Sequence, residues 1–240
     1  GICKAEALLR WKNPERGMVS PTEFISLAED IGVINEVGSW VLQEAKRWGK
    51  YWNAQFDIEL DVSVNISPVQ FKTDQDSHCS GWIETFNSLS NGHVAGASHK
   101  QNVIVEITEG LLLDADPEIL DKLYKLRSAG IEVAIDDFGT GYSSLSYLKK
   151  LPIDYLKIDR SFISNLEHDK HDLALSKAII VMAHEVGLRV IAEGVESEEQ
   201  QKILTHAGCD FAQGYLYSKP VPPEEFELLL KDQVGFKRKD

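Results

Sequence analysis

Short apolar runs alternate with helical segments along most of the chain, and this alternation restricts its fold more than any other feature. Helical stretches such as residues 116–130 and 171–187 end in glycine, which is a common helix stop. Repeated strand–helix alternation predicts a parallel sheet with helices packed on it. We expect seven strands, at residues 2–11, 58–67, 102–110, 131–139, 153–161, 188–196 and 209–217.

The strand count favours an α/β fold of the TIM-like (β/α)8 barrel type that lacks one strand. Such a barrel takes about 250 residues and eight strands, whereas this chain has 240 residues and seven predicted strands. The missing strand fits most naturally before Gly1, and the chain, which does not start with methionine, looks like a piece of a longer protein. No shift in composition marks a boundary, so we expect residues 1–240 to form a single domain. An open doubly wound sheet is the alternative, but no GxGxxG or GxxxxGK[ST] turn supports it.

Two helices are expected between the first two strands, at residues 20–32 and 35–52. The first has Ser20 as its expected N-cap, Pro21 in the first turn and Glu23 at the capping-box position. This combination is typical of a helix start, and it places the beginning of the helix immediately after Ser20.

Net charge and cysteine content exclude several classes of function. The formal charge is −13, which argues against a nucleic-acid duplex as partner because binding one requires a basic surface. No apolar run reaches the ~18 residues that a membrane span needs, so this domain itself should make no membrane contact. Cys3, Cys79 and Cys209 lie far apart and form no CxxC pair, which argues against disulfides or a zinc ribbon. We expect a reducing, cytoplasmic location, with or without a membrane anchor elsewhere in a longer parent protein.

A polar stretch between residues 72 and 101 interrupts the alternation. It contains a predicted helix at residues 81–86, followed by a segment rich in glycine, serine and asparagine that we interpret as a surface loop. Four metal-ligating side chains fall in this stretch, but their irregular spacing favours a polar loop over a metal site; they are His78, Cys79, His93 and His99.

Polar side chains recur near the carboxyl ends of the predicted strands. Because strand side chains alternate between faces, Glu106 and Asp136 lie opposite the aliphatic residues that pack on helices, and so does Lys157. In a barrel these ends converge on one mouth, where barrel enzymes carry out chemistry. Lys157 is the only cation expected among the five carboxylates and one amide there, which are Glu6, Asn65, Glu106, Asp136, Asp137 and Glu193.

Five carboxylates cannot remain ionised together without compensating positive charge. Their oxygens suit hard divalent cations such as Mg²⁺ and Mn²⁺, and a bridging carboxylate would form a two-metal centre with ions ~3.5–4 Å apart that clamps a phosphoryl group. Asp136 and Asp137 are the natural bridging pair. Each of these residues also has a simpler interpretation when it is taken singly. A lone acid is usually a solvated surface group, and Lys157 alone would be a lysine that extends along the barrel wall. Ordinary turns would account for Gly139, Gly141 and Gly194.

These residues belong to an ordered set of motifs that resembles the EAL domain family of cyclic di-GMP phosphodiesterases. The signature is Glu6-Ala7-Leu8, and it is followed by "VNIS" at 64–67, "EITEG" at 106–110, "DDFGTG" at 136–141, "LKIDRSFI" at 156–163, "VIAEGVE" at 190–196 and "QGYLYSKP" at 213–220. The resemblance implies a TIM-like barrel with one antiparallel strand, and that first strand, which precedes the EAL strand, is the one missing here. Gly110, where serine is common in the family, and the long loop at 87–101 are departures from the pattern.

The resemblance also implies roles for individual residues. Glu6, Asn65, Glu106 and Asp136 would ligate one metal ion, Asp136 and Asp137 a second, and Glu193 would bind metal directly or through water. Lys157, Glu193 and Glu6 would form the catalytic set, with Lys157 contacting the nucleophilic water and a substrate phosphate. Glu109 would anchor the loop after Asp137, and the substrate contacts would come from Leu8, Arg10, Asp159 and Gln213.

The implied activity is metal-dependent hydrolysis of cyclic di-GMP to linear pGpG, with two Mg²⁺ or Mn²⁺ ions as cofactors and with Ca²⁺ as an inhibitor. A homodimer is expected from the resemblance alone. Two alternatives remain at this point: a non-catalytic cyclic di-GMP receptor, and an unrelated acidic metal barrel of the enolase type. Receptors of the family usually lack one or more of the carboxylates, all of which this chain retains, so the sequence favours catalysis.

Overall fold

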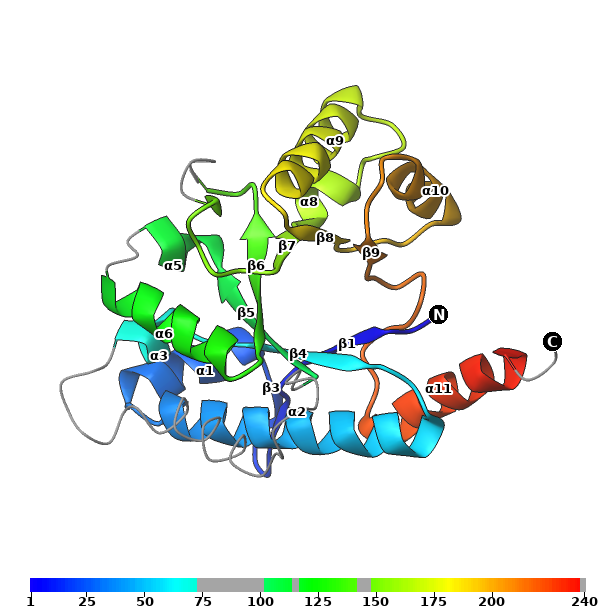
Figure 1. Ribbon diagram of the computed structural model, residues 1–240. Helices are drawn as coiled ribbons and strands as arrows, with labels where there is room; N and C mark the ends of the chain where they lie inside the picture. The colour runs from blue at the N-terminus through cyan, green and yellow to red at the C-terminus, as the bar shows by residue number, and fades with distance from the viewer. Residues whose placement is uncertain (73–101, 114–116, 142–147, 238–240) are drawn as a thin grey trace. The chain divides into compact units, whose positions relative to one another are not determined.

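A computed structural model describes residues 1–72, 102–113, 117–141 and 148–237, and Figure 1 shows its helices and strands. The predicted α/β class and the seven parallel strands are confirmed. The sheet has the order β1-β4-β5-β6-β7-β8-β9, and every pairing whose register is resolved in it is parallel. The strands are β1 (Lys4–Ala7), β4 (Asp61–Asn65), β5 (Val103–Thr108), β6 (Glu132–Phe138), β7 (Tyr155–Ile158), β8 (Arg189–Ala192) and β9 (Phe211–Ala212).

Helices follow most of these strands, as the alternation predicts. None of the helices in the described ranges is long and apolar enough to cross a membrane. The expected loop with His78, Cys79, His93 and His99 and the helix predicted at residues 81–86 lie outside the described residues. The helices are α1 (Pro21–Asp30), α2 (Ile34–Phe56), α3 (Pro68–Lys72), α5 (Glu109–Leu113), α6 (Pro117–Ser128), α8 (Arg160–Ile163), α9 (Lys170–Glu185), α10 (Glu198–His206) and α11 (Pro223–Lys237).

The chain divides into two compact units, each described here by itself. The first comprises Gly1–Val105, Lys125–Ile131 and Pro222–Asp240, and the second comprises Glu106–Tyr124 and Glu132–Val221. The first unit therefore holds β1, β4 and the N-terminal helices, whereas the second holds strands β6 to β9 with the helices that connect them.

An antiparallel hairpin in the first unit was not predicted. Strands β2 (Trp11–Asn13) and β3 (Gly17–Val19) pair in a small separate sheet. Asn13 forms the turn between them, because its side-chain oxygen accepts hydrogen bonds from the backbone N–H groups of Glu15 and Arg16. Gly17 completes the turn at φ 72°, a conformation that favours glycine.

Helix α1 begins where the sequence predicts, but the predicted capping box is wrong. Ser20 is the N-cap and Pro21 starts the helix, yet the Ser20 side chain accepts no hydrogen bond from a backbone N–H. Its hydroxyl pairs instead with that of Thr22. Glu23 accepts from Arg16 of the neighbouring hairpin, at 2.7 Å, so this side chain links two elements instead of capping one.

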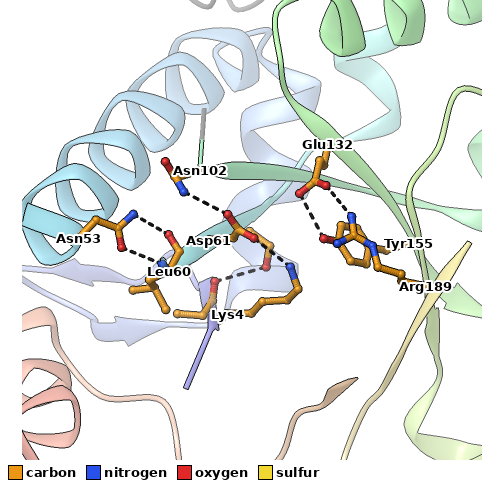
Figure 2. Close-up of polar contacts among 10 residues, drawn as sticks. Lys4, Asn53, Leu60, Asp61, Asn102, Glu132, Tyr155 and Arg189 are labelled. Atoms are coloured by element: carbon orange, nitrogen blue, oxygen red, sulfur yellow. Dashed lines mark hydrogen bonds and ion pairs between the residues drawn. The ribbon is translucent and has the colours of Figure 1, made fainter. Parts of the chain in front are cut away.

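Charged side chains at the amino ends of strands are paired within each unit (Figure 2). In the first unit, Lys4 donates to Asp61 at 3.0 Å, and Asn102 donates to the same carboxylate at 3.3 Å. In the second, Glu132 accepts from the Tyr155 hydroxyl and from Arg189, whose guanidinium stacks 4.1 Å from the Tyr155 ring centre. These pairs join strands at their amino ends, whereas the candidate metal ligands lie at the carboxyl ends, so we assign the pairs a role in stability.

Candidate metal centre

A β-bulge explains how two successive aspartates can face one site. Strand β6 pairs with β7 through Ile135 opposite Leu156 and Phe138 opposite Ile158, so β6 has one more residue than its partner in this interval. The extra residue breaks the alternation of side chains between faces. Asp136 and Asp137 therefore need not point to opposite sides of the sheet, as a regular strand would require.

The backbone of Asp137 adopts a left-handed conformation at the bulge, with φ 54°. Aspartate tolerates this region better than most residues that carry a side chain. In this conformation the Asp137 N–H donates to the Asp136 carboxylate at 3.0 Å, which orients that side chain. The pKa of the Asp137 carboxyl is raised above its usual value, first by partial burial and then by the nearby Asp136 and Asp159 carboxylates.

Lys157 supplies positive charge among three carboxylates. Its ammonium lies 2.6 Å from Glu106, 3.0 Å from Asp136 and 2.6 Å from Glu193, and its side chain is 1% exposed. Glu106 comes from β5, and Glu193 immediately follows β8, so the lysine on β7 joins acids from three neighbouring segments. This geometry replaces the simpler interpretation of Lys157 as a lysine that reaches along the wall to solvent.

The second unit also offers a set of oxygen donors that fits a divalent cation. Asp136, Asp137 and Glu193 each present one carboxylate oxygen, and these oxygens all lie within 4.8 Å of one another. Carboxylate oxygens are the ligands that Mg²⁺ and Mn²⁺ prefer. The raised pKa of Asp137 fits the same interpretation, because closely spaced acids are stabilised in their ionised form when a cation joins them.

Glu109 holds the glycine turn that follows the aspartates. The backbone N–H groups of Gly139 and Gly141 both donate to Glu109 Oε2, at 3.0 and 3.2 Å, and Glu109 is only 3% exposed. A Cβ atom at Gly141 would lie 2.8 Å from Glu109 Oε1, so a side chain here would force the Glu109 carboxylate to shift. The sequence-based role of Glu109 as a loop anchor is compatible with these contacts.

Two other sequence-predicted ligands lie together in the first unit. Asn65, the last residue of β4, donates to the Glu6 carboxylate of β1 at 2.7 Å. These strands pair in parallel with Glu6 opposite Ser63, which places Asn65 two residues further along. Leu8 is 41% exposed, and the Arg10 guanidinium donates to the Leu9 carbonyl at 2.9 Å.

The remaining candidates border the acidic cluster of the second unit. The backbone of Gln213 bonds to residues on both sides of Glu193. Its N–H donates to the Ala192 carbonyl at 2.8 Å, and its carbonyl accepts from the Val195 N–H at 3.0 Å. Asp159 caps α8 by accepting from the Ser161 N–H. The β-bulge that lets the two aspartates face one site was not predicted from the sequence. The alternation of side chains between the two faces of a strand gives no signal for a bulge.

We expect Glu109→Ala to impair metal use without removing a donor oxygen from the cluster. The substitution deletes two hydrogen bonds to a charged acceptor, so the glycine turn loses the contacts that orient the residues after Asp137. Loss of a side chain that orients metal ligands without touching the ion weakens metal affinity by ~10–100-fold in known sites. A Mg²⁺ titration of activity should therefore shift at least ~10-fold, and Glu109→Gln, which retains an acceptor oxygen, should shift less. An unchanged titration in the alanine variant would contradict the anchoring role.

Comparison with known proteins identifies a matching family and close relatives. The family model described as "EAL domain" matches residues 1–220. The bifunctional diguanylate cyclase/cyclic di-GMP phosphodiesterase MucR of Pseudomonas aeruginosa is 42% identical over 221 residues, which are 92% of this chain and 31% of MucR. The oxygen sensor protein DosP of Escherichia coli is 40% identical over 92% of this chain and 26% of its own length. The chain thus spans about a third or less of these relatives.

A solved structure of similar fold is described as the PaMucR phosphodiesterase in complex with c-di-GMP. Its TM-score is 0.80 at 40% sequence identity, and the match covers 92% of this chain and 86% of that one. The family model, at residues 1–220, spans every strand that carries one of the acidic residues.

Proposed function

Because the chain belongs to the EAL domain family, we propose that it is a metal-dependent phosphodiesterase that hydrolyses cyclic di-GMP to linear pGpG. The observation that carries the proposal is the cluster of Asp136, Asp137 and Glu193 oxygens beside the buried ammonium of Lys157. Relatives named as cyclic di-GMP phosphodiesterases support the choice of substrate. We further propose that residues 1–240 form one such domain of a longer, cytoplasmically exposed protein, and that it acts as a homodimer.

The residues that would hold the metal ions are those with convergent oxygen donors. Asp136, Asp137 and Glu193 fit this role by geometry, and we propose Glu6, Asn65 and Glu106 as the additional ligands. Bound Mg²⁺ or Mn²⁺ would supply Lewis-acid stabilisation of the phosphoryl oxygens and activation of water.

The protein's own groups orient the reaction. Lys157 holds Glu106, Asp136 and Glu193 in place through three ion pairs, and its positive charge can stabilise the charge that develops on a phosphate oxygen. Asp136 is fixed by the N–H of Asp137, and the following turn is fixed by Glu109. We propose that Leu8, Arg10, Asp159 and Gln213 contact the substrate, with the Arg10 guanidinium on a phosphate.

A non-catalytic receptor for cyclic di-GMP is the second candidate function. A receptor needs no set of carboxylates around a buried lysine. Such a set destabilises the folded protein, because like charges repel one another. The retention of all of these residues therefore favours catalysis.

Replacing Mg²⁺ with Ca²⁺ should separate binding from hydrolysis. Ca²⁺ accepts the same oxygen ligands but prefers bonds of ~2.3–2.6 Å against ~2.0–2.1 Å for Mg²⁺. Its lower charge density polarises water less, while substrate phosphates still meet a positive site. We therefore expect calorimetry to detect cyclic di-GMP binding in Ca²⁺, and product analysis to show no pGpG even when Mg²⁺ is present at comparable concentration. Full turnover in Ca²⁺ would contradict the two-metal proposal, and binding without turnover in either ion would favour the receptor.

A further inference from the structure

Helix α8 lies against the segment that carries the two aspartates. Gly139, two residues after Asp137, has φ 101°, and a Cβ atom there would lie 2.8 Å from a ring carbon of Phe162. Phe162 is the third residue of α8. Because of this close approach, the ring of Phe162 sets the smallest possible distance between helix α8 and the turn that follows Asp137.

The same helix lies against the segment that carries Glu193. A Cβ atom at Gly194, which has φ 68°, would clash with Arg160 Cγ. The Arg160 guanidinium also donates to Glu196 at 2.9 Å. Arg160 is the first residue of α8 and follows Asp159 directly. One short helix therefore touches the residue next to Glu193 and the turn next to Asp137.

Gln200 of α10 links this helix to the Glu193 segment through a buried amide. Its oxygen accepts from the N–H groups of Glu196 and Ser197, at 2.7 and 3.1 Å. Its nitrogen donates to the carbonyls of Ile163 and Ser164, where α8 ends, at 3.2 and 3.5 Å. The residue is only 6% exposed, so water does not readily replace these bonds.

We propose that α8 is a spacer that sets the separation between Asp136 and Asp137 on one side and Glu193 on the other, and that Gln200 is the positioning residue that holds this spacer. The proposal rests on the proposed function of the acidic cluster as a metal centre. Gln200 contacts no metal donor oxygen in the described contacts; it acts through α8 and through the backbone of residues 196–197. Such indirect support orients metal ligands and tunes their affinity.

The test is direct Mn²⁺ binding to the metal-free chain, measured by calorimetry well below the melting temperature. Gln200→Glu keeps an acceptor for the N–H groups of Glu196 and Ser197, as in a usual capping box, but loses both donations to α8. We expect its Mn²⁺ dissociation constant to rise ~10-fold or more. Phe162→Leu removes the ring that lies against Gly139, and it should also weaken Mn²⁺ binding. Gln201→Ala is the matched control, because Gln201 is the exposed neighbour on α10 and its loss should leave binding within about twofold.

If both Gln200→Glu and Phe162→Leu bind Mn²⁺ with wild-type affinity, the spacer proposal is overturned, even if the melting temperatures of the variants fall. A residue with a merely structural role lowers the stability of the protein without changing the metal affinity. Should Gln200→Glu fail to fold, the Phe162→Leu result decides alone. Failure of the proposed function is seen separately: a wild-type chain that binds Mn²⁺ but forms no pGpG refutes hydrolysis and leaves the binding comparison intact. A wild-type chain that binds no Mn²⁺ overturns both proposals.

Discussion

Replacing Lys157 with methionine is expected to remove most of the activity and to destabilise the metal-free protein. Methionine keeps much of the length of the side chain but leaves Glu106, Asp136 and Glu193 without the ammonium that each contacts within 3.0 Å. Removing one partner of a buried ion pair destabilises a protein by ~3–5 kcal/mol. Loss of a charge that stabilises the transition state lowers kcat by a further ~10²–10³-fold in comparable sites.

Chemical denaturation without metal measures the stability effect, and pGpG formation measures the kinetic one. Mg²⁺ should restore part of the lost stability, since an ion that binds only the folded state stabilises it. Lys122→Met is the control: Lys122 is also buried, but its Glu118 partner has a side chain that is 49% exposed, so the loss should be smaller. If the two variants lost equal amounts of unfolding free energy, the ion pairs of Lys157 with the three acids would have no larger effect on stability than the ion pair of Lys122.

Asp137→Asn should abolish hydrolysis while leaving the metal-free fold at least as stable as the wild type. Asparagine keeps the left-handed backbone at φ 54°, which few other residues tolerate. It removes one carboxylate oxygen from the donor set. We expect turnover to fall at least ~100-fold, which is more than the loss of a residue that only supports a metal ligand costs.

The stability effect of this substitution should depend on pH. The pKa of Asp137 is raised in the folded protein, chiefly by burial and then by Asp136. A group with a raised folded pKa stabilises the fold below its unfolded pKa, ~3.9 for aspartate, and loses that contribution as pH rises through the folded pKa. The variant should therefore melt higher than wild type at neutral pH without metal, and the gap should close near pH ~3.5.

Asp57→Asn controls for the change of residue type, since Asp57 also has a left-handed backbone, φ 51°, but caps helix α2 in the first unit. It should leave turnover and metal dependence unchanged. If Asp137→Asn retained wild-type turnover, Asp137 would not be a ligand, and the assignment of the adjacent aspartates to a metal centre would fail.

The strand–helix order was predictable because buried strands and amphipathic helices impose strong periods on the sequence. Gly130 and Gly187, which follow α6 and α9, both have a positive φ of 78° and 84°, in line with their expected role as helix stops. The β2–β3 hairpin was missed although Asn13, Pro14 and Gly17 give a usable turn signal. Its strands have three residues each, which is too few for an alternating pattern of apolar and polar residues to be recognised.

The grouping of acids near the strand ends was predictable from composition and position, but their detailed arrangement was not. Strict alternation places Asp136 and Asp137 on opposite faces, and only the bulge against β7 removes this conflict. The contacts of Gln200 and Phe162 were likewise hidden, because they join residues that are distant in sequence and of types common in any helix.

The central claim is that this chain hydrolyses one phosphodiester bond of cyclic di-GMP with the acidic cluster around Lys157. The most direct measurement is product analysis by mass spectrometry after incubation of the purified chain with cyclic di-GMP and Mg²⁺ in ¹⁸O-labelled water. We predict pGpG with a single ¹⁸O atom in its terminal phosphate, formed only when divalent metal is present and absent for Asp137→Asn. Intact cyclic di-GMP, recovered from a chain that binds both the nucleotide and Mg²⁺, would contradict the claim.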